Sequence, residues 1–103
     1  MRKITKESVK AFFNAERYCK NNTTVKVLDN VTVFLLHDNP IALRYNDPNR
    51  TLSITNCGWF SNTTKERLNG ILTHIGHAGI YQKNFSWFLN GEKWNGDLTD
   101  IKL

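Results

Sequence analysis

Residues 23–45 read TTVKVLDNVTVFLLHDNPIALRY, and their pattern predicts the centre of the fold. Apolar, often β-branched side chains alternate with polar ones in three short segments, which is the pattern of strands with one buried face. Turn-forming residues separate these segments at 29–30 and 37–40. Leu52 and Ile54 belong to a fourth segment of the same kind. The sequence therefore predicts four strands in an antiparallel meander.

The chain before the meander has the pattern of an amphipathic helix that runs to about Lys20. Thr5 is the predicted N-cap, and Ile4 and Val9 are spaced as a hydrophobic staple. On this helix Glu16 projects toward the apolar side, where a carboxylate needs an ionic partner. We expect the apolar side to pack on the sheet.

Positive charge is concentrated in this first helix. Residues 1–26 hold seven basic and two acidic side chains, whereas the rest of the chain holds seven of each. At 100° per residue, five of the basic side chains share one arc of the helix: Lys3, Lys6, Lys10, Arg17 and Lys20. We expect this stripe to face an acidic partner, and its candidate contact residues are Lys6, Lys10, Arg17 and Lys20.

A second helix and a hairpin are predicted after the meander. Thr63 and Glu66 have the spacing of a capping box, and apolar residues follow at helical intervals. Gly76 is expected to end this helix in the left-handed conformation. Asn90 and Gly91, between two apolar runs, are typical of a two-residue hairpin turn.

These elements predict a single α+β domain over residues 1–103. Two helices pack on one face of an antiparallel sheet of about five to six strands, in the order α-β-β-β-β-α-β-β-β. No apolar run is long enough to cross a membrane, and we expect no signal peptide because no apolar stretch follows the charges of residues 1–6. A soluble, cytoplasmic protein is expected.

Residues 56–69 read NCGWFSNTTKERLN. This segment resembles a family of small uncharacterised bacteriophage proteins, in which a Gly-Trp loop is followed by a Thr-Thr-x-x-Arg-Leu-Asn helix. The likeness extends to residues 3–5, 39–42, 81–83 and 87–91, although Phe88 stands where we expect a tyrosine. The resemblance implies a phage accessory protein made in the host cytoplasm, and it supplies no catalytic residue.

Within this motif, some residues have structural explanations and others do not. Trp59 is expected to fill the corner between strand and helix, and Leu68 to enter the core. Lys65, Arg67 and Asn69 lie off the apolar stripe, so either a solvated face or a contact surface explains them. Lys65 and Arg67 are therefore added to the candidate contact residues.

No residue pattern predicts an enzyme, a metal or a cofactor. Cys19 and Cys57 are expected to be reduced, small, buried or half-buried residues. Cys57 lies several residues before the second helix, and no histidine forms a recognised signature with it. His74 and His77 straddle the predicted helix end at Gly76, which breaks the geometry that two metal ligands on a helix require.

Two binding hypotheses remain. The first is an inhibitor or modulator of a host protein or nucleoprotein machine, such as a defence system, anchored by aromatic residues. Five large aromatic residues exceed the needs of one small core: Trp59, Phe60, Trp87, Phe88 and Trp94. Trp94 is a candidate contact residue. The segment Phe85 to Leu89 is apolar on both faces, so it is either a central strand or covered by a partner such as a second copy.

The second hypothesis is a DNA- or RNA-binding protein. The basic first helix would follow the phosphates, and exposed aromatic residues such as Tyr18, Tyr81 or Trp94 would stack on bases. A third reading, a virion or assembly component, predicts oligomers without a host partner. We rank inhibition of a host machine first.

Overall fold

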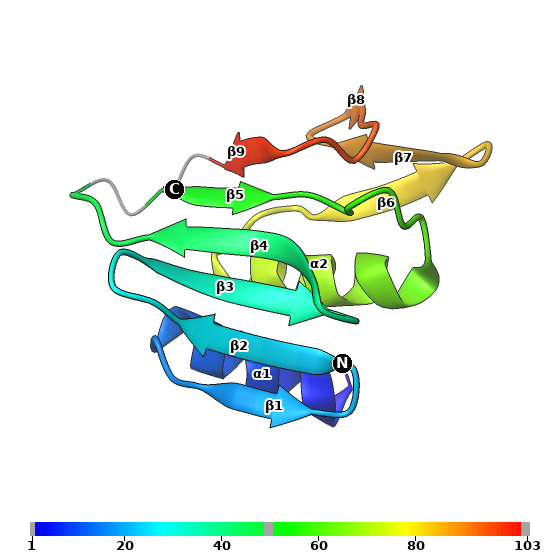
Figure 1. Ribbon diagram of the computed structural model, residues 1–103. Coiled ribbons are helices and arrows are strands. Elements are labelled where there is room, and N and C mark those ends of the chain that lie inside the picture. Colours follow the sequence, from blue (N-terminus) through cyan, green and yellow to red (C-terminus); the bar gives the residue numbers. More distant parts are fainter. Residues whose placement is uncertain (1, 49–50, 102–103) are drawn as a thin grey trace.

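The predicted meander forms the centre of a six-stranded sheet. A computed structural model describes residues 2–48 and 51–101 of the chain. The meander strands are β2 (Thr23–Val27), β3 (Val31–Leu36), β4 (Asn39–Tyr45) and β5 (Leu52–Ile54). The edge strands are β1 (Tyr18–Lys20) and β9 (Thr99–Ile101), which gives the antiparallel order β1-β2-β3-β4-β5-β9 (Figure 1). The predicted α+β class is confirmed.

The hairpin between β3 and β4 turns where the sequence predicts. His37 and Asp38 have φ angles of 51° and 63°. Two left-handed residues in succession are typical of the type I′ turn, whose twist matches that of the flanking strands. The register shifts between Phe34, which pairs with Ala42, and Leu35, which pairs with Pro40, so Ile41 is an extra residue on β4.

The first helix, α1 (Lys3–Phe13), ends seven residues earlier than predicted. The chain leaves it through Ala15, whose φ is 53°, and residues 18–20 then pair with β2. Pairing gives these backbone groups partners in the sheet, and this tertiary contact overrides the local helical pattern. The predicted position of Glu16 on an apolar helix face is therefore wrong, because Glu16 is exposed in the connection to β1.

The cap of α1 is also different from the prediction. Arg2 occupies the N-cap position and makes no side-chain capping bond. Thr5 lies inside the helix and is fully buried, so it is not the cap.

The second helix, α2 (Asn62–His74), has its N-cap two residues before the predicted one. Ser61 is the N-cap, since its Oγ accepts a hydrogen bond from the backbone N–H of Thr64 at 3.1 Å. Thr63 is thus a helical residue, and Glu66 does not complete a capping box. The predicted left-handed end is confirmed, because Gly76 has a φ of 77°.

The remaining strands form a second sheet of three. It contains β6 (Ile80–Lys83), β7 (Ser86–Leu89) and β8 (Glu92–Lys93), with β7 in the centre. The hairpin predicted at Asn90 and Gly91 is confirmed, with φ angles of 56° and 79°. The chain then returns to the six-stranded sheet through β9. The tail therefore makes a separate small sheet, which the sequence patterns do not predict.

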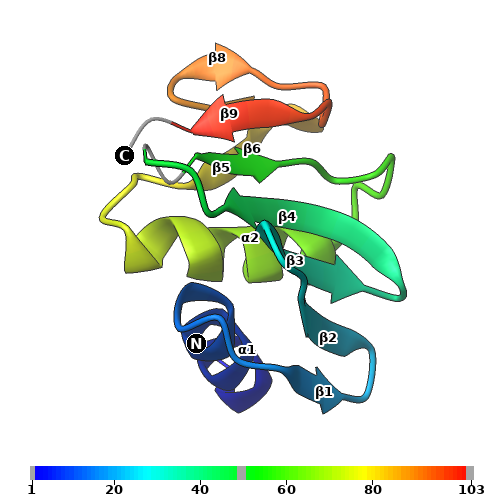
Figure 2. The ribbon, with the colours of Figure 1, turned by 60° about the vertical axis from the view of Figure 1, so that its left-hand side comes forward.

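Both helices lie on the same face of the large sheet, as predicted (Figure 2). The core lies between the helices and the large sheet. Its fully buried residues include Phe12, Phe34, Leu52, Leu68 and Ile71. The rings of Phe12 and Phe34 meet edge to face with centroids 5.7 Å apart. The small sheet joins this core through Ile80, Trp87 and Leu89.

Arg67 lies inside this core, so its predicted place on a contact surface is wrong. Its side chain is fully buried. Nε donates to Oγ1 of Thr23 at 3.2 Å, and Nη1 donates to Oγ1 of Thr5 at 2.9 Å and to the carboxylate of Glu66. Thr5 also donates to Glu66 at 2.6 Å. A buried guanidinium needs such partners, and here they join α1, α2 and β2.

Candidate protein-binding surface

The loop between β5 and α2 is fixed to the body of the protein at three successive residues. The backbone N–H of Thr55 donates to the carbonyl of Ile41 at 2.9 Å. The N–H of Asn56 donates to the carbonyl of Gly96 at 3.1 Å. Sγ of Cys57 donates to the carbonyl of Pro40 at 2.8 Å. The loop is therefore held from both of its sides.

Asn56 organises the inside of this loop. Its side chain is buried, and Oδ1 accepts from the N–H of Gly58 at 2.8 Å. Its carbonyl accepts from the N–H of Trp59 at 2.9 Å. Gly96 packs against it so closely that a Cβ at residue 96 would overlap the Asn56 side chain. The close approach, together with a φ of 88°, requires glycine at this position.

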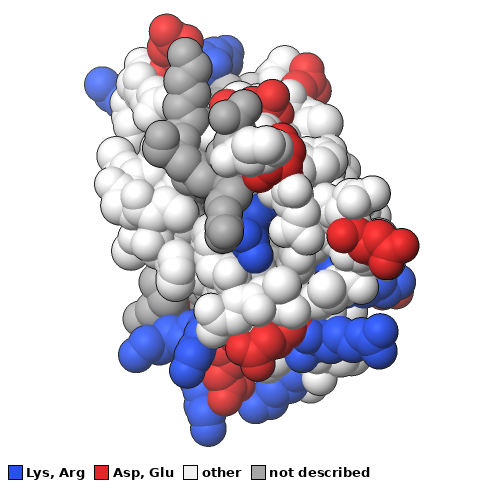
Figure 3. All heavy atoms as spheres, turned by 90° about the vertical axis from the view of Figure 1, so that its left-hand side faces the viewer, with Lys and Arg blue, Asp and Glu red and all other residues white. Residues whose placement is uncertain are grey.

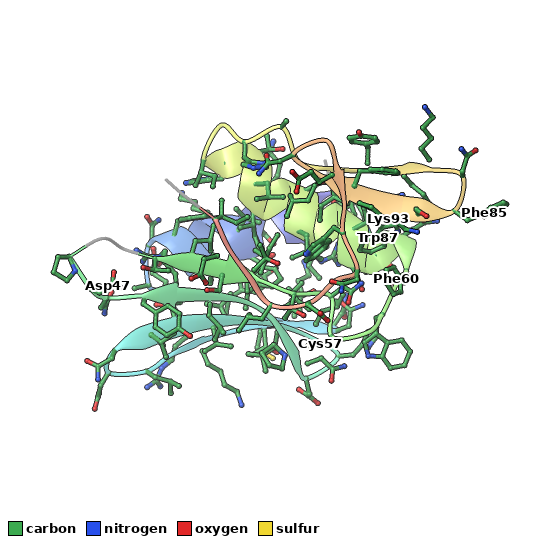
Figure 4. The ribbon with its side chains drawn as sticks, turned by 90° about the horizontal axis from the view of Figure 1, so that it is seen from above. Asp47, Cys57, Phe60, Phe85, Trp87 and Lys93 are labelled. Carbon is green, nitrogen blue, oxygen red and sulfur yellow. The ribbon has the colours of Figure 1, made fainter. Side chains whose placement is uncertain are left out.

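The fixed loop presents two aromatic side chains to solvent. Trp59 is 60% exposed and Phe60 is 56% exposed. The prediction that Trp59 fills the corner between strand and helix is wrong, because Asn56 occupies the inside of the turn. Phe60 is held by Trp87, whose ring it meets edge to face at 5.1 Å between centroids (Figure 4).

A groove of about 420 Å³ lies beside Trp59. One wall comes from the β3–β4 hairpin and the other from the loop and the first turn of α2. Its lining includes Leu36, His37, Ile41, Trp59, Ser61 and Thr64. An apolar groove next to an exposed, fixed tryptophan has the features of a site that receives an apolar side chain of a partner.

Both cysteines are exposed, so their predicted burial is wrong. Cys57 has a φ of 52° and turns the chain at the surface, while Cys19 lies on the edge strand β1. Desolvation raises the pKa of the Cys57 thiol above its ordinary value. A raised pKa lowers the thiolate fraction, which makes this thiol a poor nucleophile at neutral pH.

The basic candidates gather at one end of the molecule, although not on one helix. Lys6 and Lys10 are exposed on α1, Arg17 lies in the connection that follows, and Lys20 lies on β1. Figure 3 shows Lys and Arg side chains gathered over the lower part of this end, where Figure 1 places α1, β1 and β2. Nζ of Lys20 lies 3.9 Å from the Glu7 carboxylate. The predicted helical stripe is thus replaced by a basic end built from three elements.

Lys65 and Trp94, the other candidates, have partners within the protein. Nζ of Lys65 donates to Oε1 of Gln82 at 3.0 Å, which links α2 to β6. Trp94 is buried, and its Nε1 donates to Oγ1 of Thr99 at 3.0 Å. The predicted role of Trp94 in an exposed contact is therefore wrong, because its ring belongs to the core beside Trp87.

The rest of the motif that resembles phage proteins also has structural roles. Asn69 donates from Nδ2 to the carbonyl of Ile80 at 3.0 Å and accepts from the N–H of the same residue at 2.6 Å. These bonds attach the start of β6 to α2. The Arg-Leu-Asn segment therefore joins three layers of the fold rather than forming a contact surface.

Two of the three histidines, His74 and His77, have structural partners as well. His74 stacks on Phe13 with ring centroids 4.3 Å apart, and Nδ1 of His77 accepts from the N–H of Gly79 at 3.0 Å. Within residues 2–48 and 51–101, no three His, Cys, Asp or Glu side chains gather as metal ligands would.

Sequence reasoning missed the most exposed aromatic residue. Phe85 is 97% exposed at the tip of the β6–β7 hairpin. Asn84 before it is a common turn residue that tolerates the left-handed conformation, so Asn84 is the signal that could have placed Phe85 in a turn.

The fold and this surface define a small α+β protein with a fixed aromatic loop beside an apolar groove. A model of the family described as Kyanoviridae Gp96 protein matches residues 1–100. The chain belongs to this family and is therefore a phage protein. Comparison with curated proteins and with solved structures found no match. Neither helix in the described part of the chain has the length and apolar character that a membrane span requires.

Proposed function

We propose that this phage protein is a non-enzymatic inhibitor or modulator that acts in the host cytoplasm. Its target is a host protein or nucleoprotein machine, such as a defence system. The observation that carries the proposal is the exposure of Trp59 and Phe60 on a loop that hydrogen bonds hold in place.

Two physical properties of this loop favour a protein partner. Exposed tryptophan and phenylalanine side chains present a large apolar surface to water. Burial of that surface in a partner's pocket is favourable in free energy. A loop that is already ordered loses little further conformational entropy on binding. The groove beside Trp59 adds a receptor for the partner's own apolar side chain.

Affinity capture from a host lysate tests this proposal. The bait is the tagged wild-type protein, and a second bait carries Trp59→Ser and Phe60→Ser. Leu98→Ser is the matched control, because Leu98 is 58% exposed and lies outside the loop. We expect wild type and Leu98→Ser to retain one host protein after nuclease treatment and the double variant to lose it. Equal retention by all three baits would contradict the proposal.

Nucleic-acid binding through the basic end is the second candidate function. Lys6, Lys10, Arg17 and Lys20 lie on α1, the connection after it and β1, and this grouping favours nucleic-acid binding. Figure 3 shows Lys and Arg side chains gathered at this end, with acidic side chains among them. Binding of this kind depends on phosphate charge, so it falls steeply with salt. A Lys6→Glu, Lys10→Glu variant that binds duplex DNA as well as wild type does would exclude it.

A further inference from the structure

One face of the small sheet carries a row of side chains that the core does not use. Tyr81 of β6 pairs with Phe88 of β7, and Phe88 pairs with Lys93 of β8. The rings of Tyr81 and Phe88 are stacked, with centroids 5.2 Å apart and planes 10° from parallel. Tyr81 is 49% exposed. An aromatic pair and a lysine thus lie side by side across three strands.

The opposite face of the small sheet packs on the core. Ile80, Trp87 and Leu89 are buried in the core. Successive residues in a strand point to opposite faces, so Tyr81 and Phe88 lie on the solvent side. Trp87 and Leu89 already attach β7 to the core, so the stacked pair outside it adds only a cross-strand contact to the fold and leaves half of Tyr81 exposed.

Phe85 extends this surface at the hairpin tip. It is almost fully exposed, and its φ of 65° lies in the left-handed region, which a bulky side chain rarely adopts. Figure 4 shows its ring pointing away from the body of the protein. Neither burial nor backbone geometry favours phenylalanine here. An unfavourable residue kept at full exposure indicates a role in binding.

The charges of this face are positive. Lys83 lies two residues after Tyr81 and therefore on the same face, and Lys93 stands beside Phe88. Glu92 is the acidic residue of these strands, and it pairs with Leu89, which places it on the other face. Flat apolar rings flanked by lysines complement a ligand that has flat rings and negative charge.

We propose that Tyr81, Phe85 and Phe88, with Lys83 and Lys93, form a binding surface for single-stranded nucleic acid. The aromatic rings stack on unpaired bases, and the lysines contact the phosphates. Duplex bases are already stacked on one another, so this surface discriminates against a duplex. The surface is separate from the loop and groove of the proposed function and does not depend on them.

Fluorescence anisotropy with labelled 12-nucleotide oligo-dT and oligo-rU tests the proposal on the full chain. We expect binding of one or both at 50 mM salt and a clear loss of affinity at 200 mM. Phe85→Gly suits a left-handed turn, so it keeps the fold while removing one ring. We expect it to weaken binding about 5- to 150-fold, the range for loss of one stacked base. The oligonucleotide that binds with the higher affinity identifies the ligand as DNA or RNA.

Matched variants locate the binding surface. Lys93→Gln should weaken binding and reduce its salt dependence, whereas Lys26→Gln on β2 should change neither. Leu28→Ala removes an exposed apolar side chain from another hairpin and should bind as wild type does. Trp59→Ser should also bind normally, which separates this surface from the groove.

Three results would overturn the proposal: no binding of either oligonucleotide at 50 mM salt, unchanged binding by both Phe85→Gly and Tyr81→Ala, or loss only with Lys6→Glu, Lys10→Glu. The last result would assign nucleic acid to the basic end instead. Circular dichroism of each variant confirms that it is folded.

Discussion

The two hairpin turns of the small sheet have similar φ angles but very different side chains at their second residue. Asn90 and Gly91 join β7 to β8 with φ angles of 56° and 79°, and Asn84 and Phe85 join β6 to β7 with φ angles of 51° and 65°. The first tip has the residues that a left-handed turn favours. The second has phenylalanine where the backbone favours glycine.

This difference separates what the fold requires from what it tolerates. Gly91 relieves strain and contributes no side chain, so the turn alone explains it. Phe85 adds strain and exposes an apolar ring, so the turn does not explain it. Residues at which the fold's preference is violated without a packing benefit are the ones to examine for function. The free energies of unfolding of single-residue variants distinguish the two kinds of residue.

Arg67→Ala is expected to cause the largest loss of stability, because the Arg67 side chain is fully buried and hydrogen-bonds to Thr5, Thr23 and Glu66. The variant removes the guanidinium that pairs with the partly buried carboxylate of Glu66. In the described part of the chain, the structure records no other cation beside this carboxylate. We expect a loss of about 3–5 kcal/mol in the free energy of unfolding, measured by urea denaturation. Lys65→Ala is the control and should cost less than about 1 kcal/mol. A loss below 1 kcal/mol for Arg67→Ala would show that the buried network does not stabilise the fold.

Gly96→Ala tests a glycine that is required for two reasons. The new Cβ would overlap the Asn56 side chain, and the φ of 88° adds backbone strain. We expect a loss of about 2–4 kcal/mol by urea denaturation. Binding through Trp59 should weaken too, because Asn56 organises that loop. Unchanged stability would mean that the loop adapts easily and is not fixed.

Gly91→Ala tests a glycine that is required for conformation alone. Nothing lies within 4 Å of a Cβ built at this position, so only the left-handed φ opposes alanine. We expect a loss of about 1 kcal/mol, seen as a lower urea midpoint. A loss as large as that of Gly96→Ala would contradict the idea that this tip is free of contacts.

Phe85→Gly is the smallest expected change and has the opposite sign. Relief of left-handed strain is partly offset by the greater flexibility of glycine in the unfolded chain. We expect a gain of up to about 1 kcal/mol, together with weaker oligonucleotide binding. Thermal denaturation measures the gain. A clear loss of stability would show that the Phe85 ring supports the fold, and the comparison of the two tips would then fail.

Local patterns predicted most of the secondary structure. Alternation and turn residues located β2 to β5, and the dipeptide Asn90-Gly91 located the last hairpin. Helix ends were less predictable: residues 18–20 have helical spacing, yet they pair with β2 because sheet pairing competes with helix formation. The cap of α2 was also not predictable locally, because both Ser61 and Thr63 carry a hydroxyl that suits an N-cap. In the structure Ser61 takes this position.

The candidate sites could be predicted only in part. Positive charge at the N-terminal end is a property of composition, so Lys6, Lys10, Arg17 and Lys20 are exposed as expected. The exposure of Trp59 and the burial of Trp94 depend on how the 55–61 loop meets the segment around Gly96. Those segments are some 40 residues apart, and no local pattern encodes their contact.

By itself, the sequence determined the α+β class, the meander, both helices and the basic end, because these depend on side-chain periodicity, turn chemistry and charge within short segments. The tertiary structure alone decided that Arg67 is buried while Trp59 and Phe85 are exposed. Burial depends on which distant residues fill the space around a side chain. Arg67 enters the core because Thr5, Thr23 and Glu66 meet there, whereas no packing partner covers the ring of Phe85 in the described part of the chain.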